Sequence, residues 1–290
     1  MTLRLLGGIG EIAPQYDGFI LDLWGVLHDG TAPFPGVLDA LAHLRSAGKR
    51  VAILSNAPRR ATLVAERLRE IGIPPALYDH IYSSGEEAWR HLQQRDDAFH
   101  AALGRVCYHI GPARDDNMLA GIGLTRVADI DAADFILNTG PGRWEETVAD
   151  YEPMLVRAHA RDLPMVCANP DLVVMHQNHR AICAGALAQR YEEMGGRVRW
   201  HGKPFAPVYE TCFALLGIAD RRRILAVGDS LRTDIAGAAT VGIDSVLVAG
   251  GIHGEEFGIA EHEIPDLERL AAGVAASGHR PNAVIARFRW

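Results

Sequence analysis

The sequence predicts an α/β protein built around a parallel β-sheet. Short, continuous apolar runs recur along the chain, and such runs are typical of strands that are buried on both faces. Segments with helical spacing of apolar residues lie between these runs, which gives the strand–helix alternation of a parallel sheet. Several of the apolar runs also end in a carboxylate or another small polar residue, which is where open parallel sheets carry their reactive groups.

The first half of this alternation begins with an apolar strand at Phe19–Trp24. A loop follows, and apolar spacing then predicts a helix over Val37–Ser46, ended by Gly48. Arg50–Leu54 is a second buried strand, and a helix runs from about residue 60 to 71. The rhythm predicts a βαβ unit.

The same rhythm returns later in the chain. The strands expected there are Val106–Ile110, Phe135–Asn138, Met165–Ala168, Ile224–Val227 and Asp244–Val248. A helix of small residues is expected between the last two of these strands, at Asp234–Val241.

Composition excludes several classes of function. The chain has 290 residues, 48% of them apolar and 22% charged, which is ordinary for a soluble globular protein. Its net charge of −7 disfavours a nucleic-acid partner. Apolar runs are too short for a membrane span, and the N-terminus does not resemble a signal peptide, so we expect a cytoplasmic protein without a membrane partner.

Cysteine and histidine spacings do not predict a metal site. The four cysteines are scattered without a CxxC pair, so we expect buried, reduced thiols. His176 and His179 have ligand-like spacing, but without supporting cysteines or acids we interpret them as a solvated or hydrogen-bonded pair.

Polar residues at the predicted strand ends describe one site. Asp22 lies in the first strand, Ser55 and Asn56 follow the second, and Asp229 follows a later one, with Asp234 five residues on. Lys203 precedes a helical stretch. Two carboxylates suit a hard cation, Mg²⁺ first of all.

These residue types together favour phosphoryl chemistry. A cation beside Asp22 orients a phosphoryl oxygen, and Asp22 can then act as the nucleophile that forms an aspartyl-phosphate. The Ser55 hydroxyl and the Asn56 backbone N–H suit phosphate oxygens, and the Lys203 ammonium holds both the phosphate and the nucleophile. The phosphate-binding set expected from the sequence is therefore Ser55, Asn56 and Lys203.

The segments DLWGVLHDG, ILSNAPR, HGKP and GDSLRTD occur in an order that resembles the four motifs of the haloacid dehalogenase (HAD) superfamily. ANPD at Ala168–Asp171, followed by AICAGALAQRYEEMGG, is similar to the class IIA branch, which includes NagD-type and nitrophenyl-phosphatase-like enzymes. The resemblance implies a Rossmann-like HAD core at residues 1–83 and 201–290, with an inserted α/β C2-type cap at 84–200. It implies a Mg²⁺-dependent hydrolase of small phosphorylated metabolites.

The resemblance also implies roles for individual residues. Asp22 matches the nucleophile and a metal ligand, and Lys203 matches the lysine of the third motif. Asp229 matches the acidic Mg²⁺ ligand, and Asp234 matches the second acid of the fourth motif. Asn169 and Asp171 fall where class IIA enzymes place substrate-facing cap residues, and a homodimer is expected by analogy.

The first motif departs from the family pattern at Trp24. The family's phosphatases carry there a second Asp, which protonates the leaving group; the backbone carbonyl of this position binds the metal, and Trp24 keeps that carbonyl. An indole supplies no proton, and general acid–base catalysis contributes about 10²–10⁴ in rate. Three interpretations follow: Asp29 or His28 replaces the acid; the substrate has a good leaving group, as in an acyl phosphate; or the protein binds a phosphorylated ligand without turnover.

Overall fold

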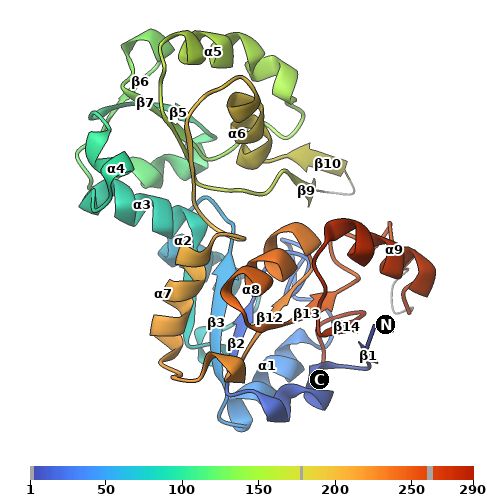
Figure 1. The fold of residues 1–290 in the computed structure, drawn as a ribbon. Coiled ribbons are helices and arrows are strands. Elements are labelled where there is room, and N and C mark those ends of the chain that lie inside the picture. The colour runs from blue at the N-terminus through green and yellow to red at the C-terminus, as the bar shows by residue number, and fades with distance from the viewer. Residues whose placement is uncertain (1–2, 177–178, 260–263) are drawn as a thin grey trace. The chain divides into compact units, whose positions relative to one another are not determined.

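The computed structural model describes residues 3–176, 179–259 and 264–290. The side chains of His176 and His179, interpreted above as a non-ligating pair, lie outside the described part. The chain divides into two compact units (Figure 1). Unit 1 comprises residues 1–55, 65–82 and 203–290, and unit 2 comprises residues 56–64 and 83–202.

The strands of the described chain are β1 (Leu5–Leu6), β2 (Gly18–Leu21), β3 (Arg50–Ser55), β4 (His80–Ser83), β5 (Val106–Ile110), β6 (Thr125–Val127), β7 (Phe135–Asn138), β8 (Met165–Cys167), β9 (Val173–His176), β10 (His179–Ile182), β11 (Val198–Trp200), β12 (Ile224–Gly228), β13 (Asp244–Val248) and β14 (Ala283–Ile285). The α-helices are α1 (Val37–Ser46), α2 (Ala61–Glu70), α3 (Ser84–Gln94), α4 (Ala98–Ala102), α5 (Val148–Ala160), α6 (Ala184–Glu193), α7 (Ala206–Leu216), α8 (Ala236–Val241) and α9 (Leu267–Ser277). The shorter helical segments are η1 (Ile9–Glu11), η2 (Ala13–Gln15), η3 (Pro75–Leu77), η4 (Ala113–Leu119), η5 (Ile130–Ala132), η6 (Arg221–Arg223) and the π-helical turn η7 (Leu231–Ile235).

Unit 1 contains a seven-stranded sheet with the strand order β1-β14-β13-β12-β2-β3-β4. The strand β2 lies between β12 and β3 and is parallel to both, so these three strands end at the same edge of the sheet. Leu21 pairs with Val227 on one side and with Ile53 on the other. This register brings the residues that follow β2, β3 and β12 to neighbouring positions.

One face of this sheet is covered by α7 and α8 (Figure 1). Alternate residues of the central strands, such as Ile20, Ala52 and Ala226, are buried against apolar side chains of α7. Neighbouring strand residues such as Phe19 are buried as well, which explains why these strands read as unbroken apolar runs.

Unit 2 contains a five-stranded parallel sheet with the order β11-β8-β7-β5-β6. The helices α5 and α6 pack on one face through Leu155, Leu187 and Tyr191. The helix α3 packs on the other face through Ala88 and Leu92. Unit 2 is therefore a sheet between two helical layers, and the α/β class expected from the sequence is confirmed.

Most predicted elements coincide with observed ones, including α1, β5, β7 and β13. The first strand is shorter than predicted: it ends at Leu21, and backbone hydrogen bonds to the Leu23 carbonyl then turn the chain. The helix predicted from Asp234 is preceded by η7, which carries Asp234 itself. The four cysteines are buried thiols, as predicted. Within the described residues, no helix is long and apolar enough to cross a membrane.

Candidate active site

The carboxyl edge of the unit 1 sheet gathers most of the polar residues singled out in the sequence. Asp22 directly follows β2, and its backbone N–H continues the ladder to the carbonyl of Val227 at 2.9 Å. Ser55 ends β3 on one side of Asp22, and Asp229 follows β12 on the other. Three neighbouring parallel strands thus present Asp22, Ser55 and Asp229 at one edge.

Lys203 connects two of the carboxylates. Its Nζ donates to Asp22 Oδ1 at 2.5 Å and to Asp234 Oδ1 at 2.8 Å. The lysine is only 2% exposed. Burial alone lowers its pKa, but the facing carboxylates Asp22 and Asp234 raise the pKa well above its ordinary value, so Lys203 is a fixed positive charge.

Asp22, Asp229 and Asp234 form a compact carboxylate cluster, with one oxygen from each lying within 4.8 Å of the others. Burial first, and then the charges of Asp22 and Asp234, raise the pKa of Asp229 well above its ordinary value. The cluster therefore carries more negative charge than the single Lys203 cation compensates. Oxygen donors with excess negative charge are the surroundings that a hard divalent cation requires, so these residues fit such an ion.

The backbone around Asp229 is packed unusually closely. Asp229 Oδ2 accepts the Ile252 N–H at 2.7 Å. A Cβ atom on Gly25 would lie 1.9 Å from this oxygen, and a Cβ on Gly251 would lie 2.1 Å from it. Only glycine allows the chain after β2 and the chain after β13 to approach the carboxylate in this way.

Asp234 is held by the π-helical turn η7. Its Oδ2 accepts the Ser230 N–H at 3.1 Å, while Oδ1 accepts from Lys203. A Cβ on Gly228 would lie 2.0 Å from Asp234 Cγ, so the end of β12 must also be glycine. π-Helical turns are rare and occur frequently at functional sites. Here the turn places Asp234 against the lysine.

Trp24 is half-buried and packs on the loop that follows it. Its ring makes an edge contact with His28, at 5.6 Å between ring centroids, and covers Gly30, whose missing Cβ would lie 2.4 Å from the indole. The predicted metal contact of the Trp24 carbonyl stays a prediction.

The two residues proposed to replace the missing acid are engaged within the same loop. Asp29 Oδ1 accepts from the Thr31 hydroxyl and from the backbone N–H groups of Thr31 and Ala32 at 2.6, 2.8 and 3.0 Å. The Thr31 hydrogen bond is the largest cause that lowers the pKa of Asp29, so its carboxylate is ionised at neutral pH. His28 Nδ1 accepts the Gly30 N–H at 2.9 Å, and burial lowers the pKa of His28 to about 4. Neither group is therefore protonated as a general acid at neutral pH requires.

The remaining predicted residues lie in unit 2, which begins at Asn56. Asn56 Nδ2 donates to Asp171 Oδ1 at 2.9 Å, and the Asp171 N–H donates to Asn169 Oδ1 at 2.9 Å. The structure thus joins Asn56 to the two expected substrate-facing residues. Their role toward a substrate, and that of Asn56 toward a phosphate, stay predictions.

Sequence reasoning missed the groups that shape the surroundings of Asp229, namely Gly25, Gly251 and Ile252, and missed Gly228, which lies against Asp234. Ile252 acts through its backbone N–H, which leaves no trace in the residue type. The glycines carried a signal, since each follows or ends an apolar strand-like run. Their role becomes visible only where the strand ends meet around the carboxylates of Asp229 and Asp234.

Comparison with known proteins agrees with this geometry. Residues 19–125 match the family model described as haloacid dehalogenase-like hydrolase, and residues 200–285 match the model described as HAD-hydrolase-like. Chronophin of Mus musculus is 30% identical over 265 residues, which cover 86% of this chain and 86% of chronophin. Glycerol-3-phosphate phosphatase of Gallus gallus is 28% identical over 266 residues, covering 83% of this chain and 82% of that enzyme.

Solved structures give the same result. A haloacid dehalogenase-like hydrolase from Brucella suis 1330 superimposes with a TM-score of 0.83 at 30% identity, covering 98% of this chain and 100% of that chain. A p-nitrophenyl phosphatase from Archaeoglobus fulgidus shares the fold, with a TM-score of 0.71 at 23% identity over 94% of this chain and 96% of that chain. The chain therefore belongs to the haloacid dehalogenase-like hydrolase family, as its four motifs predicted.

Proposed function

We propose that the protein is a Mg²⁺-dependent phosphatase of small phosphorylated metabolites, with Asp22 as the nucleophile. The observation that carries the proposal is the position of Asp22, which is paired with a buried Lys203 and lies beside Asp229 in one carboxylate cluster. Relatives named as phosphatases of glycerol 3-phosphate and of nitrophenyl phosphate support the reaction class.

Asp22, Asp229 and the Trp24 carbonyl would hold the cation, with Asp234 behind them. The cation would neutralise charge on the phosphoryl group and orient it, and Mg²⁺ is the ion that best suits this oxygen donor set. The Lys203 ammonium holds the Asp22 carboxylate in place and supplies a fixed positive charge for the phosphoryl oxygens. The Ser55 hydroxyl, at the end of the adjacent strand, is the proposed donor to another phosphoryl oxygen.

In the proposed reaction Asp22 attacks phosphorus, and the bond from phosphorus to the leaving-group oxygen breaks. Water then attacks the phosphorus of the aspartyl-phosphate, the bond from phosphorus to the Asp22 oxygen breaks, and phosphate leaves with both protons of the water while the Asp22 carboxylate is restored. The leaving-group oxygen of the first step departs with the electron pair and needs a proton only if it is strongly basic. Trp24 supplies no proton. Asp29 and His28, the two candidates for a replacement acid, are each held by hydrogen bonds within their own loop. We therefore propose a substrate with a weakly basic leaving group, such as an acyl or aryl phosphate.

A leaving-group series tests this function. Phosphate release is measured with Mg²⁺ for an acyl phosphate, 4-nitrophenyl phosphate and alkyl phosphates such as glycerol 3-phosphate. We expect the alkyl esters to react about 10²–10⁴-fold more slowly, the range that general acid catalysis contributes. Asp22→Asn should abolish release, and Asp17→Asn, the same change on the exposed end of the sheet, should not. Equal residual release by the wild type and Asp22→Asn would exclude the covalent mechanism.

A second function is favoured by Trp24 alone: binding of a phosphorylated ligand without turnover. It predicts saturable binding of the same compounds and no release from any of them. Release by the wild type separates the two functions, and Trp24→Asp reports what Trp24 does to the chemistry. A strong rise in hydrolysis of alkyl phosphates shows that Trp24 limits the chemistry, whereas a loss of existing activity shows that the native reaction depends on Trp24. Asp29→Asn in parallel reports whether Asp29 takes any part.

A further inference from the structure

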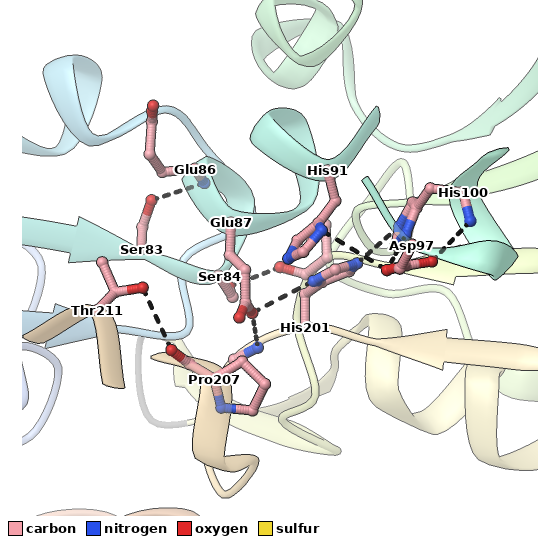
Figure 2. A network of polar contacts seen from close by, with 12 residues as sticks. Ser83, Ser84, Glu86, Glu87, His91, Asp97, His100, His201, Pro207 and Thr211 are labelled. Atoms are coloured by element: carbon pink, nitrogen blue, oxygen red, sulfur yellow. Dashed lines mark hydrogen bonds and ion pairs between the residues drawn. The ribbon is translucent and has the colours of Figure 1, made fainter. Parts of the chain in front are cut away.

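Unit 2 contains a partly buried group of three histidines and two carboxylates that the proposed phosphatase mechanism does not use. We call it the histidine cluster: Glu87, His91, Asp97, His100 and His201 (Figure 2). Glu87 and His91 are one turn apart on α3, Asp97 and His100 belong to α4 and its N-cap, and His201 follows β11. The three ring centroids are 5.0–5.2 Å apart.

Two of the rings are each oriented by a carboxylate. His100 Nδ1 lies 2.8 Å from Asp97 Oδ2, and His201 Nδ1 lies 3.3 Å from Glu87 Oε2. Glu87 Oε2 also accepts the Gly202 N–H at 2.8 Å. Because the Asp97 oxygen accepts from His100, the proton of the neutral His100 ring belongs on Nδ1, and its Nε2 then carries a lone pair. His201 contacts Glu87 through Nδ1, which leaves its Nε2 facing His100.

The two Nε2 atoms face each other at 3.2 Å, as Figure 2 shows. At this distance a proton on one Nε2 forms a hydrogen bond to the other, and two deprotonated Nε2 atoms are placed to bind one metal ion. Zn–N bonds are about 2.0–2.1 Å long, so two nitrogens at a tetrahedral angle lie about 3.3–3.4 Å apart. The observed separation of His100 and His201 is close to that value. Histidine ligands whose other nitrogen donates to a carboxylate are also the usual arrangement around protein-bound metals.

Further donors surround this pair. Ligand atoms of Glu87, His91 and His201 lie within 4.8 Å of one another, and so do those of His91, Asp97 and His100. His91 is therefore within reach of both halves of the cluster. The side chains of His91 and Asp97 are 29% and 34% exposed, which opens this side of the cluster to solvent.

Burial and donor type also favour a metal ion at this cluster. His100 is fully buried, and its ring lies against the rings of His91 and His201 and beside the Asp97 carboxylate. The cluster thus combines imidazole nitrogen with carboxylate oxygen, the donor types that bind divalent transition metals.

We propose that the histidine cluster binds a divalent transition metal of the zinc class, with His100 Nε2 and His201 Nε2 as its first two ligands and His91 as the third donor. Imidazole nitrogen with flanking carboxylate selects such ions over Mg²⁺, which prefers oxygen. The metal joins α3, α4 and the end of β11 within unit 2. This site is separate from the carboxylate cluster of unit 1 and does not depend on the proposed phosphatase function.

Cobalt(II) and zinc(II) are the probes that test the site. The full-length protein in excess Mg²⁺ is titrated with Co²⁺, and visible absorption and stoichiometry are recorded. We expect one equivalent of Co²⁺ with the absorption of a four-coordinate nitrogen-ligated ion, displaced by one equivalent of Zn²⁺. Absence of this spectrum in the wild-type protein overturns the proposal without any variant, and leaves a hydrogen-bonded histidine network.

Variants assign the binding to the cluster. His100→Ala and His201→Ala should abolish the one-equivalent signal, and Asp97→Asn should weaken it about 10–100-fold, as expected for a group that orients a ligand. His159→Ala is the matched control, because His159 is an exposed histidine of α5 outside the cluster. Asp229→Asn should leave the signal unchanged. Binding that persists in both His100→Ala and His201→Ala, or that is lost in Asp229→Asn, refutes the site.

Discussion

Replacing Lys203 by Met is the sharpest test of the charge arrangement in unit 1. Methionine keeps much of the apolar length of the lysine stem, so the substitution leaves a small cavity and mainly removes the charge. The Nζ atom that is lost donates to Asp22 at 2.5 Å and to Asp234 at 2.8 Å. Both carboxylates then remain in a buried cluster with Asp229 and without their cation.

The expected loss follows from this geometry. Removing one partner of a buried ion pair costs about 3–5 kcal/mol, because the other charge stays buried without compensation. Lys203 is 2% exposed and serves two carboxylates, which places the variant toward the upper end of that range. With a urea m-value of about 3 kcal/mol/M, a loss of about 5 kcal/mol moves the unfolding midpoint down by about 1.7 M.

Lys49 provides a matched control, since Lys49 and Lys203 are the two lysines of the chain. Lys49 donates to the Tyr16 carbonyl at 2.6 Å and lies 4.0 Å from the half-exposed carboxylate of Asp17. Lys49→Met should cost only about 1 kcal/mol, the contribution of a single hydrogen bond and a surface ion pair.

The assay is urea unfolding of both variants with and without Mg²⁺, together with native-state hydrogen exchange of β2 and β12, which reports unit 1 separately from unit 2. Saturating Mg²⁺ should recover part of the loss in Lys203→Met, because the ion replaces some of the missing positive charge. Equal destabilisation by the two substitutions in the absence of Mg²⁺ would refute the buried charge network.

Three further predictions concern other parts of the chain. Gly25→Ala should abolish phosphate release and weaken Mg²⁺ binding, because the added Cβ would lie 1.9 Å from the carboxylate of Asp229. Gly48→Ala is the control: Gly48 also has a positive φ but no atom within 4 Å of the added Cβ, so this change should only lower stability by about 1 kcal/mol. Leu155→Ala in the unit 2 core should cost about 2–5 kcal/mol in thermal or urea unfolding, and Val156→Ala, half exposed on the same helix, less than about 0.5. Burial acts to raise the pKa of Asp79, but hydrogen bonds from a backbone N–H of β3 and from a neighbouring arginine lower that pKa overall from 3.8. The ionised carboxylate therefore stabilises the fold above pH 3.8, and this stabilisation is lost as the pH falls below that value. The destabilisation by Asp79→Asn seen at neutral pH should accordingly vanish in unfolding curves recorded in acid. A pH-independent difference would contradict this account.

The sequence alone was sufficient to predict the fold class, the family and most strands. Buried parallel strands carry apolar residues on both faces, so β3, β5, β7 and β13 stand out as continuous apolar runs. Local spacing is also enough to place α1, whose apolar residues repeat with the helical period. The four polar motifs were recognisable because parallel strands end at one edge, which lets their positions in the sequence imply proximity.

Tertiary structure decided the features that depend on contacts between distant segments. The assignment of residues 56–64 to unit 2 was not readable from composition. Lys203 is placed between Asp22 and Asp234 only by packing of segments that lie 181 and 31 residues from it in the sequence.

The same reason explains what the sequence could not reveal about histidines. Glu87 and His91 have helical spacing, and Asp97 and His100 are three residues apart, but neither pair alone is distinguishable from a solvated helix face. They become a candidate metal site only where His201, a hundred residues later, brings its Nε2 to 3.2 Å from that of His100. The sequence by itself determined which elements form and which family they build. The approach of side chains across those elements, on which the chemistry depends, was determined by packing.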